Sequence, residues 1–275
     1  MESKNIVHGL WISGNLSSLE LLTIHSFLEH GYQFYFWTYE NTLQNLPPGV
    51  IIKDAGEIIK EEEVFQYSYE NQFGHGKGSY AGFSDIFRYK LLYEYGGWWT
   101  DMDITCLKRL PSTENYFFRQ NKKSAVGNLM HCPKHSEVML WCYEHAKLKI
   151  NAQNTNWSLP IQILNDGIEK FELKDYVEKI SNNDSWLEVS SLLRDNKIPD
   201  HYYCIHWMNE EFRRLDISKE RFPEKSNLYQ LLERYNLKRF PIQSITERIR
   251  FSITTSASYY LLINLKHLPA YLRQK

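Results

Sequence analysis

The sequence predicts an α/β protein with a mostly parallel central sheet. Short apolar strands alternate with an amphipathic helix near the N-terminus, which is the pattern of a βαβ unit. Hydrophobic residues make up 43% of the chain and charged residues 24%, as is typical of a globular domain with a sizeable core. The net charge of −1 argues against a general nucleic-acid binder.

The first βαβ unit is expected at the N-terminus. Apolar residues at helical spacing predict a helix that Gly31 closes. The predicted elements are strands over residues 5–11, 32–39 and 50–53 and a helix over residues 16–30. Ligands of parallel sheets bind beyond the carboxyl ends of the strands, so Trp11 and Ser13 are candidates for contacting a nucleotide base. Packing of Trp11 in the core explains the same position equally well.

A helix is predicted in the middle of the sequence. Residues 84–95 contain no proline, Gly96 is expected to end the helix, and Ser79 is a suitable N-cap before it. Asp85 and Arg88 lie three residues apart and therefore share one face of this helix.

Residues 97–105 are rich in aromatic and β-branched residues and predict a short strand or strand end. Because residues i and i+2 of a strand point the same way, Asp101 and Asp103 are expected to face one point, with Met102 buried between them. Buried carboxylates are costly unless they are paired or bound to metal, and their oxygens suit a hard divalent cation. A solvated turn is the common alternative for D-x-D, but the preceding G-G-W-W indicates burial.

The glycine-rich segment over residues 74–79, G-H-G-K-G-S, runs into the predicted helix. It is not a Walker A motif, because Gly78 rather than Ser or Thr follows Lys77. A loop at a helix N-terminus can hold an anion. A mobile lid and a simple connector are the other interpretations.

The second half of the sequence alternates predicted strands and helices. Extended segments are expected near residues 116–119, 125–131 and 202–207, and helices over residues 135–149 and 157–165. His206 ends the last of these strands; such a histidine is more often a core residue than a ligand, although a D-x-D that needs further ligands favours a metal role. The four cysteines lack zinc-binding spacing and are expected to be buried free thiols of a reducing compartment.

A division near residue 240 is expected, with a main domain over residues 1–240 and a tail over residues 241–275. From Lys238 onward Glu247 is the single acid among many basic residues, and apolar residues recur at helical spacing up to Pro269, which is expected to end the helix. Such a tail either lies on an anionic membrane surface or packs on the core. The sequence shows no signal-peptide pattern and no apolar run long enough to span a membrane, so we expect a cytoplasmic protein, peripheral at the inner face of the cell membrane.

Two motifs together resemble a known family. S-D-x-x-R at Ser84 to Arg88 and G-G-W-W-T-D-M-D at Gly96 to Asp103 look like the signature of D-x-D sugar transferases with a GT-A fold. More specifically, they resemble the bacterial surface-polysaccharide glycosyltransferases of family 32 and their capsule and lipopolysaccharide relatives. The supporting segments are residues 10–13, 37–40, 74–81 and 205–214, so the resemblance covers the predicted main domain.

The resemblance implies a Rossmann-like, mostly parallel sheet flanked by helices, and it implies roles for single residues. Trp11 matches the residue that stacks on the donor base, with Ser13 beside it. Asp85 and Arg88 match the pair that hydrogen-bonds the donor sugar. Trp99 stands near the donor sugar and phosphate, where the family usually has tyrosine.

The metal site is implied in the same way. Asp101 and Asp103 match the D-x-D that holds Mn²⁺ or Mg²⁺ on the nucleotide's pyrophosphate. His206 matches a histidine associated with the metal and phosphates, and Asn209 and Glu210 match the adjoining N-E. Phe212 departs from the pattern, since the relatives often have tryptophan there. The residues expected to act in catalysis are Asp85, Arg88 and Asp103.

The implied function is metal-dependent transfer of a hexose from a nucleotide sugar, with UDP favoured, to a saccharide or lipid-linked saccharide in surface polysaccharide synthesis. No obvious nucleophile or base pair stands out, which agrees with the retaining outcome that the family implies. One alternative is a haloacid-dehalogenase-like phosphatase that uses D-M-D-I-T, with Asp101 as nucleophile and Asp103 as acid; it also needs a later paired-aspartate motif, which the sequence lacks. The other is a non-catalytic sugar-binding protein on the same fold. The donor sugar, acceptor, linkage and oligomeric state have no sequence signature.

Overall fold

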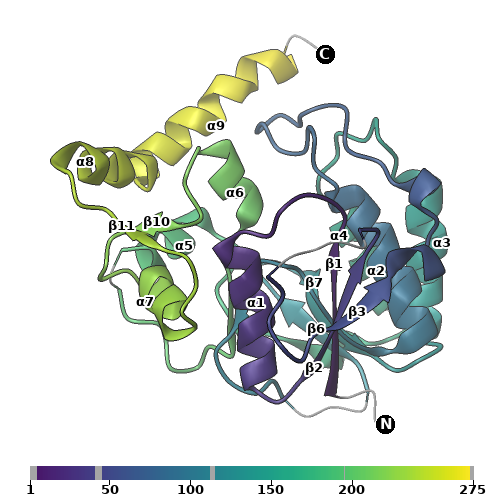
Figure 1. The fold of residues 1–275 in the computed structure, drawn as a ribbon. Coiled ribbons are helices and arrows are strands. Elements are labelled where there is room, and N and C mark those ends of the chain that lie inside the picture. Colours follow the sequence, from purple (N-terminus) through teal and green to yellow (C-terminus); the bar gives the residue numbers. More distant parts are fainter. Residues whose placement is uncertain (1–4, 41–44, 112–114, 195, 273–275) are drawn as a thin grey trace.

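The computed structural model describes the chain except residues 1–4, 41–44, 112–114, 195 and 273–275. Over these described residues, a seven-stranded sheet has the strand order β3-β2-β1-β4-β7-β6-β8 and is flanked by helices (Figure 1). Its strands are β1 (Ile6–Trp11), β2 (Gln33–Thr38), β3 (Ile51–Asp54), β4 (Gly97–Thr100), β6 (Phe117–Gln120), β7 (Ala125–Cys132) and β8 (Val177–Glu178). Two further pairs are β5 (Ile104–Cys106) with β9 (Cys204–His206), and β10 (Arg221–Phe222) with β11 (Phe240–Pro241).

The helices follow the strands in the order expected of an α/β fold. They are α1 (Ser18–Glu29), α2 (Ala81–Tyr95), α3 (Glu137–Lys149), α4 (Leu159–Lys170), α5 (Trp186–Leu192), α6 (Asn209–Arg214), α7 (Asn227–Arg234), α8 (Ile245–Thr254) and α9 (Ala257–Leu272). Short 3₁₀ helices span Ala55–Glu57, Glu61–Glu63 and Lys174–Tyr176.

Most pairings in the central sheet are parallel. Strand β1 pairs in parallel with β2 and β4, β2 pairs in parallel with β3, and β6 pairs in parallel with β8. Strand β7 is antiparallel to β4 and β6. The predicted βαβ unit and the mostly parallel, Rossmann-like sheet are therefore confirmed.

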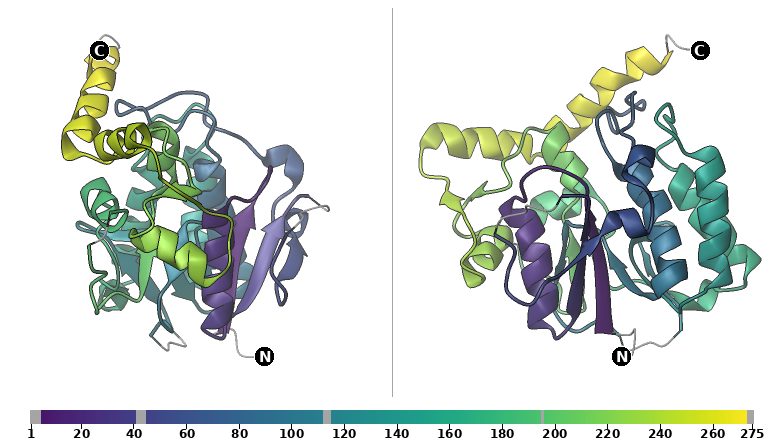
Figure 2. Two further views of the ribbon diagram at one scale, coloured as in Figure 1. Left: turned by 60° about the vertical axis from the view of Figure 1, so that its left-hand side comes forward. Right: turned by 45° about the vertical axis from the view of Figure 1, so that its right-hand side comes forward.

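Two consecutive tryptophans in β4 show how the sheet separates two cores. Trp98 and Trp99 are both buried, and they point to opposite faces because side chains alternate along a strand. Trp99 packs with residues of α2, α3 and α4. Trp98 packs on the other side with Ile24 and Phe27 of α1. These layers are visible in Figure 2.

Helix α2 begins earlier than expected. It starts at Ala81 rather than Ser84, and its N-cap is Tyr80 rather than Ser79. The Ser79 hydroxyl nevertheless accepts a hydrogen bond from the Ala81 amide at 3.1 Å. The helix ends at Gly96 as predicted; there φ is +67°, and a Cβ would lie 2.6 Å from the Lys134 amide nitrogen, so only glycine fits.

The C-terminal third forms a separate cluster against the flank of α1. Trp186 of α5, Phe212 of α6 and Leu228 of α7 pack with Leu19 and Leu22 of α1. The expected helical extension consists of two helices, α8 and α9, and α9 projects at the end of the molecule opposite the N-terminus (Figure 2). The prediction that Pro269 ends the run is wrong, because α9 continues to Leu272.

The four cysteines are buried free thiols, as predicted. Among the described residues, no helix combines the length and the apolar character needed to cross a bilayer.

Candidate functional site

A cavity of about 810 Å³ lies where β1 and β4 end. All of the site residues predicted from the sequence line it: Trp11, Ser13, Asp85, Arg88, Trp99, Asp101, Asp103, His206, Asn209 and Glu210. They come from segments far apart in the chain, and the sheet brings them together at the carboxyl ends of two parallel strands.

Trp11 and Ser13 lie on the segment that leaves β1. The Trp11 indole N–H donates to the Gly14 carbonyl at 2.7 Å, and this bond fixes one edge of the ring. The Ser13 hydroxyl is 3.2 Å from the Tyr80 hydroxyl at the start of α2. This wall of the cavity therefore joins the end of β1 to the N-terminus of α2.

The two aspartates of D-x-D lie in a turn and not in one strand. Strand β4 ends at Thr100, and the Ile104 amide donates to the Asp101 carbonyl at 3.3 Å across the turn. The predicted strand over residues 97–105 is thus wrong in part, because the chain leaves the central sheet at Thr100 and then pairs with β9. Met102 between the aspartates is buried, as predicted.

Asp101 belongs to a group that α2 organises. The Arg88 guanidinium lies 3.0 Å from the Asp85 carboxylate and 3.3 Å from Oδ1 of Asp101. The Trp99 indole N–H donates to the same Oδ1 at 2.8 Å, and Arg88 lies over the Trp99 ring. A Cβ at Gly127 would lie 2.8 Å from Nη1 of Arg88, so the absence of a side chain there makes room for the guanidinium.

Burial shifts the protonation of both carboxylates in this group. Burial raises the pKa of Asp85 to about 7, against the attraction of Arg88, and the charge of Asp101 adds to the increase. Burial also raises the pKa of Asp101, and Arg88 opposes that shift. The two carboxylates therefore compete for one guanidinium, and a bound cation would relieve that competition.

Asp103 belongs to a different group, which β9 and the segment before α5 organise. Oδ2 of Asp103 accepts from the Asn209 amide at 2.6 Å and lies 3.4 Å from Nε2 of His206. The other ring nitrogen of His206, Nδ1, is 2.7 Å from Oδ1 of Asp184. Asp184 in turn forms a bidentate ion pair with Arg119, whose side chain is fully buried.

His206 is held between two carboxylates. Burial opposes a charge on the ring, but Asp103 and Asp184 outweigh it and raise the pKa of His206 to about 10. The same contacts lower the pKa of Asp103 and of Asp184 despite their burial. The imidazole therefore carries a proton at neutral pH in this arrangement.

Sequence reasoning missed the residues that support His206. The Asn182 side chain accepts from the His206 amide and donates to its carbonyl, both at 2.9 Å.

The sequence also offered no prediction for Lys219, which lines the cavity, and its Nζ lies 2.6 Å from the buried carboxylate of Glu20. The role of Arg119 could have been predicted from the sequence, since an arginine inside the apolar run F-F-R-Q indicates a buried ion pair. The role of Asp184 could not, because the segment N-N-D is typical of an ordinary polar loop.

The glycine-rich loop over residues 74–79 is hydrogen-bonded to α6. Five of its amides donate within the protein: Gly74 to Asn71, His75 to the Asn71 side chain, Gly76 to Glu210, Gly78 to Tyr67, and Ser79 to Gly76. The His75 ring lies 3.0 Å from the carboxylate of Glu211. These bonds argue against an anion-binding loop, because five of the six loop amides are already engaged.

The D-x-D carboxylates suit a divalent cation in their chemistry. The contacts described above fall on Oδ1 of Asp101 and Oδ2 of Asp103, and both residues line the cavity. Carboxylate oxygen is the donor that Mg²⁺ and Mn²⁺ prefer. Within the described ranges, no three His, Cys, Asp or Glu side chains already form a group able to hold a metal ion. The protein therefore offers two oxygen donors rather than a complete cage.

The mostly parallel sheet places the protein in the α/β class, in which ligands bind beyond the carboxyl ends of the strands. Residues 20–124 match the family model described as glycosyltransferase sugar-binding region containing DXD motif. The match spans less than half of the chain but includes Asp85, Arg88, Asp101 and Asp103. The predicted class, a DXD-containing glycosyltransferase, is thereby confirmed, and the match favours it over the phosphatase. Membership of family 32 in particular stays a prediction.

Two solved structures are similar to the chain at low identity. The PaToxG glycosyltransferase is 13% identical, with a TM-score of 0.43, and the alignment covers 95% of this chain and 86% of that one. The ligand-free glycosyltransferase domain from the YGT toxin is 10% identical, with a TM-score of 0.45, and the alignment covers 94% and 98% of the two chains. No curated protein matches the chain significantly.

Proposed function

We propose that this glycosyltransferase is metal-dependent and retaining, and that it moves a hexose from a nucleotide sugar, with UDP favoured, to a saccharide or lipid-linked saccharide in surface polysaccharide synthesis. One observation carries the proposal: the residues expected to contact base, sugar and diphosphate all line a single cavity at the ends of β1 and β4. The proposal places the enzyme in the cytoplasm, peripheral at the inner face of the cell membrane, with residues 1–240 as the catalytic domain.

The sugar end of the donor is assigned to Asp85 and Arg88. Arg88 is held by two carboxylates and by the Trp99 ring, so its direction is fixed before a ligand arrives. Its remaining N–H groups and the Asp85 oxygens supply donors and acceptors for sugar hydroxyls. Together they would orient the anomeric carbon.

The diphosphate end is assigned to Asp101 and Asp103. These carboxylates would hold Mn²⁺ or Mg²⁺, and the bound cation offsets the negative charge that develops on the departing diphosphate. His206, also expected as a metal ligand, would first have to lose the proton that Asp103 and Asp184 hold on it. While protonated, His206 instead adds a positive charge beside the diphosphate.

Retention is the proposed stereochemical outcome. In that mechanism the proton of the acceptor hydroxyl passes to the departing phosphate, so no side chain has to serve as a base. Asp101, the nucleophile of the phosphatase alternative, is engaged by Arg88 and by the Trp99 indole, which makes it a poor nucleophile.

A hydrolysis screen of UDP- and GDP-sugars with Mn²⁺ tests the proposal. We expect release of the nucleoside diphosphate from one donor, loss of turnover in EDTA, and a retained anomeric configuration in the product by NMR. Equal turnover in EDTA contradicts metal dependence, and an inverted product contradicts retention. Donor binding by calorimetry without any turnover favours the non-catalytic binder.

Trp11→Ala is expected to weaken UDP binding by about 1–3 kcal/mol, roughly 5- to 150-fold in Kd, because a base–aromatic stacking contact is lost. Isothermal titration of UDP in Mn²⁺ measures the change. Trp11→Phe is the matched control and should lose less, since it keeps a ring. An unchanged Kd in Trp11→Ala would mean that Trp11 only packs in the core.

A further inference from the structure

The outer face of α8 is apolar. Ile245, Ile249 and Ile253 recur every fourth residue, so they form one stripe along the helix, and each is more than half exposed. The opposite side of α8 packs on the body through Phe251 and the buried Thr255 just beyond the helix. The exposed stripe is therefore the outward side of a docked helix.

Helix α9 continues this pattern. Leu261, Leu262 and Leu265 are each more than half exposed. With the three isoleucines of α8, they account for six of the thirteen exposed large hydrophobic residues found among the described residues. Scattered exposed apolar residues are normal, but this concentration in two consecutive helices marks an interaction surface.

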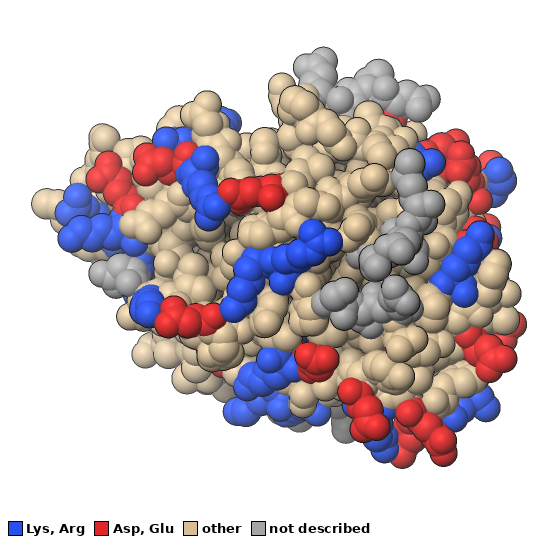
Figure 3. All heavy atoms as spheres, turned by 90° about the horizontal axis from the view of Figure 1, so that it is seen from below, with Lys and Arg blue, Asp and Glu red and all other residues tan. Residues whose placement is uncertain are grey.

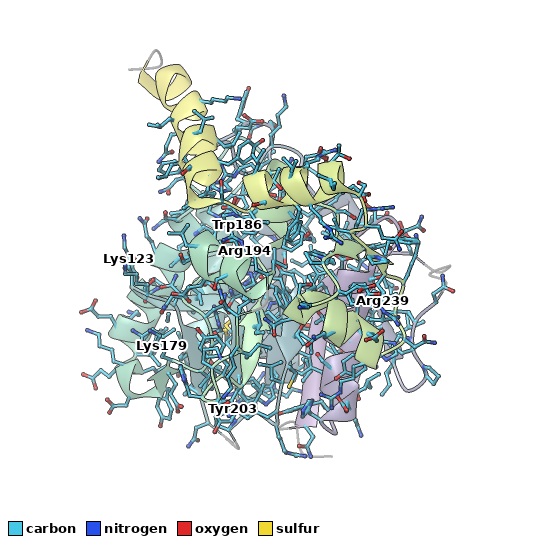
Figure 4. The ribbon with its side chains drawn as sticks, turned by 90° about the vertical axis from the view of Figure 1, so that its left-hand side faces the viewer. Lys123, Lys179, Trp186, Arg194, Tyr203 and Arg239 are labelled. Atoms are coloured by element: carbon cyan, nitrogen blue, oxygen red, sulfur yellow. The ribbon has the colours of Figure 1, made fainter. Side chains whose placement is uncertain are left out.

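Both helices are held firmly in place by the protein body. Arg194 donates to the Thr255 carbonyl at 2.8 Å, at the junction of the helices. Tyr260 donates to Glu211 at 3.2 Å, and Arg214 donates to the Asn264 side chain at 2.7 Å. Figure 4 shows Trp186 and Arg194 beneath the junction. The body therefore presents the apolar residues outward in a fixed arrangement.

Part of the stripe borders a hollow at the junction of the two helices. Ile249 and Ile253 line this hollow of about 440 Å³ with Leu215, Tyr259 and the ion pair of Arg250 and Asp216. The six exposed isoleucines and leucines named above are called the outer face below.

Basic side chains border the outer face. Arg248 is exposed beside the isoleucine stripe of α8, and Lys266 is exposed on α9. Arg250, on the other side of the stripe, pairs with Asp216, and Glu247 pairs with Arg221. The face seen from below, at the other end of the molecule, instead shows acidic and basic side chains interspersed (Figure 3). An apolar stripe with exposed basic side chains beside it is complementary to an anionic lipid surface.

The outer face adjoins the candidate active site. Tyr260, one turn before Asn264 on α9, lines the site cavity, and its neighbour Leu261 belongs to the outer face. A bilayer that contacts α9 would therefore lie near the Tyr260 wall of that cavity.

We infer that the outer face of α8 and α9 docks on an anionic lipid bilayer, with the isoleucines and leucines entering the headgroup region and Arg248 and Lys266 contacting lipid phosphates. The inference rests on the proposed function and also names the acceptor class. The acceptor would be a saccharide anchored to a lipid of that bilayer, which would reach the cavity beside Tyr260.

Co-sedimentation of the full chain with vesicles tests the inference. Vesicles of phosphatidylcholine with about 30% phosphatidylglycerol should bind the wild type, and pure phosphatidylcholine vesicles should bind it more weakly. The double variant I249E/I253E should lower the partition coefficient about tenfold or more, because two charges replace the apolar stripe. Arg248→Ala should give a smaller loss and a weaker dependence on salt.

The double variant I52E/L148E is the matched control, since it places two glutamates at exposed apolar positions on β3 and α3. Its vesicle binding should equal that of the wild type. Equal binding by I249E/I253E and the wild type overturns the inference. The inference is also overturned if the wild type does not bind vesicles but forms a concentration-dependent dimer that I249E/I253E abolishes. The outer face would then bind a second copy of the chain.

Hydrolysis of a free nucleotide sugar separates the two proposals. I249E/I253E should hydrolyse the soluble donor as the wild type does, because neither isoleucine lines the site cavity. A wild type that binds vesicles but hydrolyses no donor overturns the proposed function and leaves the docking surface standing. A wild type that hydrolyses donor but ignores anionic vesicles overturns the docking surface alone.

Discussion

Asp103→Asn is expected to lower kcat/KM by about 10²- to 10³-fold for both donor hydrolysis and sugar transfer. The substitution removes one of the two carboxylate charges assigned to the cation and also removes one of the two anionic partners of His206. Because asparagine has nearly the same shape, it can still accept the hydrogen bond from the Asn209 amide. Steady-state kinetics over a Mn²⁺ titration should show both a lower plateau and a weaker apparent metal affinity.

Asp200→Asn is the control for that experiment, because the Asp200 side chain is 86% exposed and lies outside the cavity. It should leave kcat, KM and the Mn²⁺ dependence unchanged. An Asp103→Asn enzyme that keeps wild-type kinetics and Mn²⁺ dependence would contradict the assignment of Asp103 to the metal diphosphate.

Arg119→Met is expected to lower the free energy of unfolding by about 3–5 kcal/mol, the cost of breaking a buried ion pair by removing one partner. Arg119 is fully buried, and it donates to Asp184, Asn128 and the Asn182 carbonyl, so its loss leaves several buried acceptors without a donor. Urea unfolding followed by circular dichroism measures the change.

The exposed pair of Lys174 and Glu169 is the internal comparison for Arg119. Both side chains are more than two thirds exposed, and Lys174→Ala should cost only about 0–1 kcal/mol. Adding Asp184→Asn to Arg119→Met should recover part of the loss, because it removes the carboxylate that lost its guanidinium partner. An Arg119→Met protein that is as stable as Lys174→Ala would show that the buried pair contributes little.

Local patterns were sufficient to predict the α/β fold. The βαβ unit was readable because short apolar runs, helical periodicity and Gly31 occur in sequence order, and the helix end at Gly96 followed from one glycine. The start of α2 was misplaced because Tyr80 caps it without a side-chain bond, which leaves no sequence signal. The break in the strand at Thr100 depends on pairing with the distant β9, which no local pattern records.

The candidate site likewise contains residues that local sequence patterns predict and residues that only the folded structure brings together. Asp85, Arg88 and the D-x-D motif were found because they lie close together in sequence, and the family match includes them. Asp184 and Asn182 were missed because their role comes from contacts with His206, which only the folded chain creates. The motif resemblance supplied Trp11 and His206, for which spacing alone left core packing at least as good an explanation.

Because Asp101 and Asp103 lie in a turn, different elements of the fold hold the two carboxylates in place. Asp101 depends on the central sheet and α2, whereas Asp103 depends on β9 and α6 in the C-terminal third. Insertions and deletions after β7 can therefore rebuild the surroundings of Asp103 without moving Asp101. A chimera that exchanged the C-terminal third with a relative would keep the surroundings of Asp101 and replace part of the surroundings of Asp103.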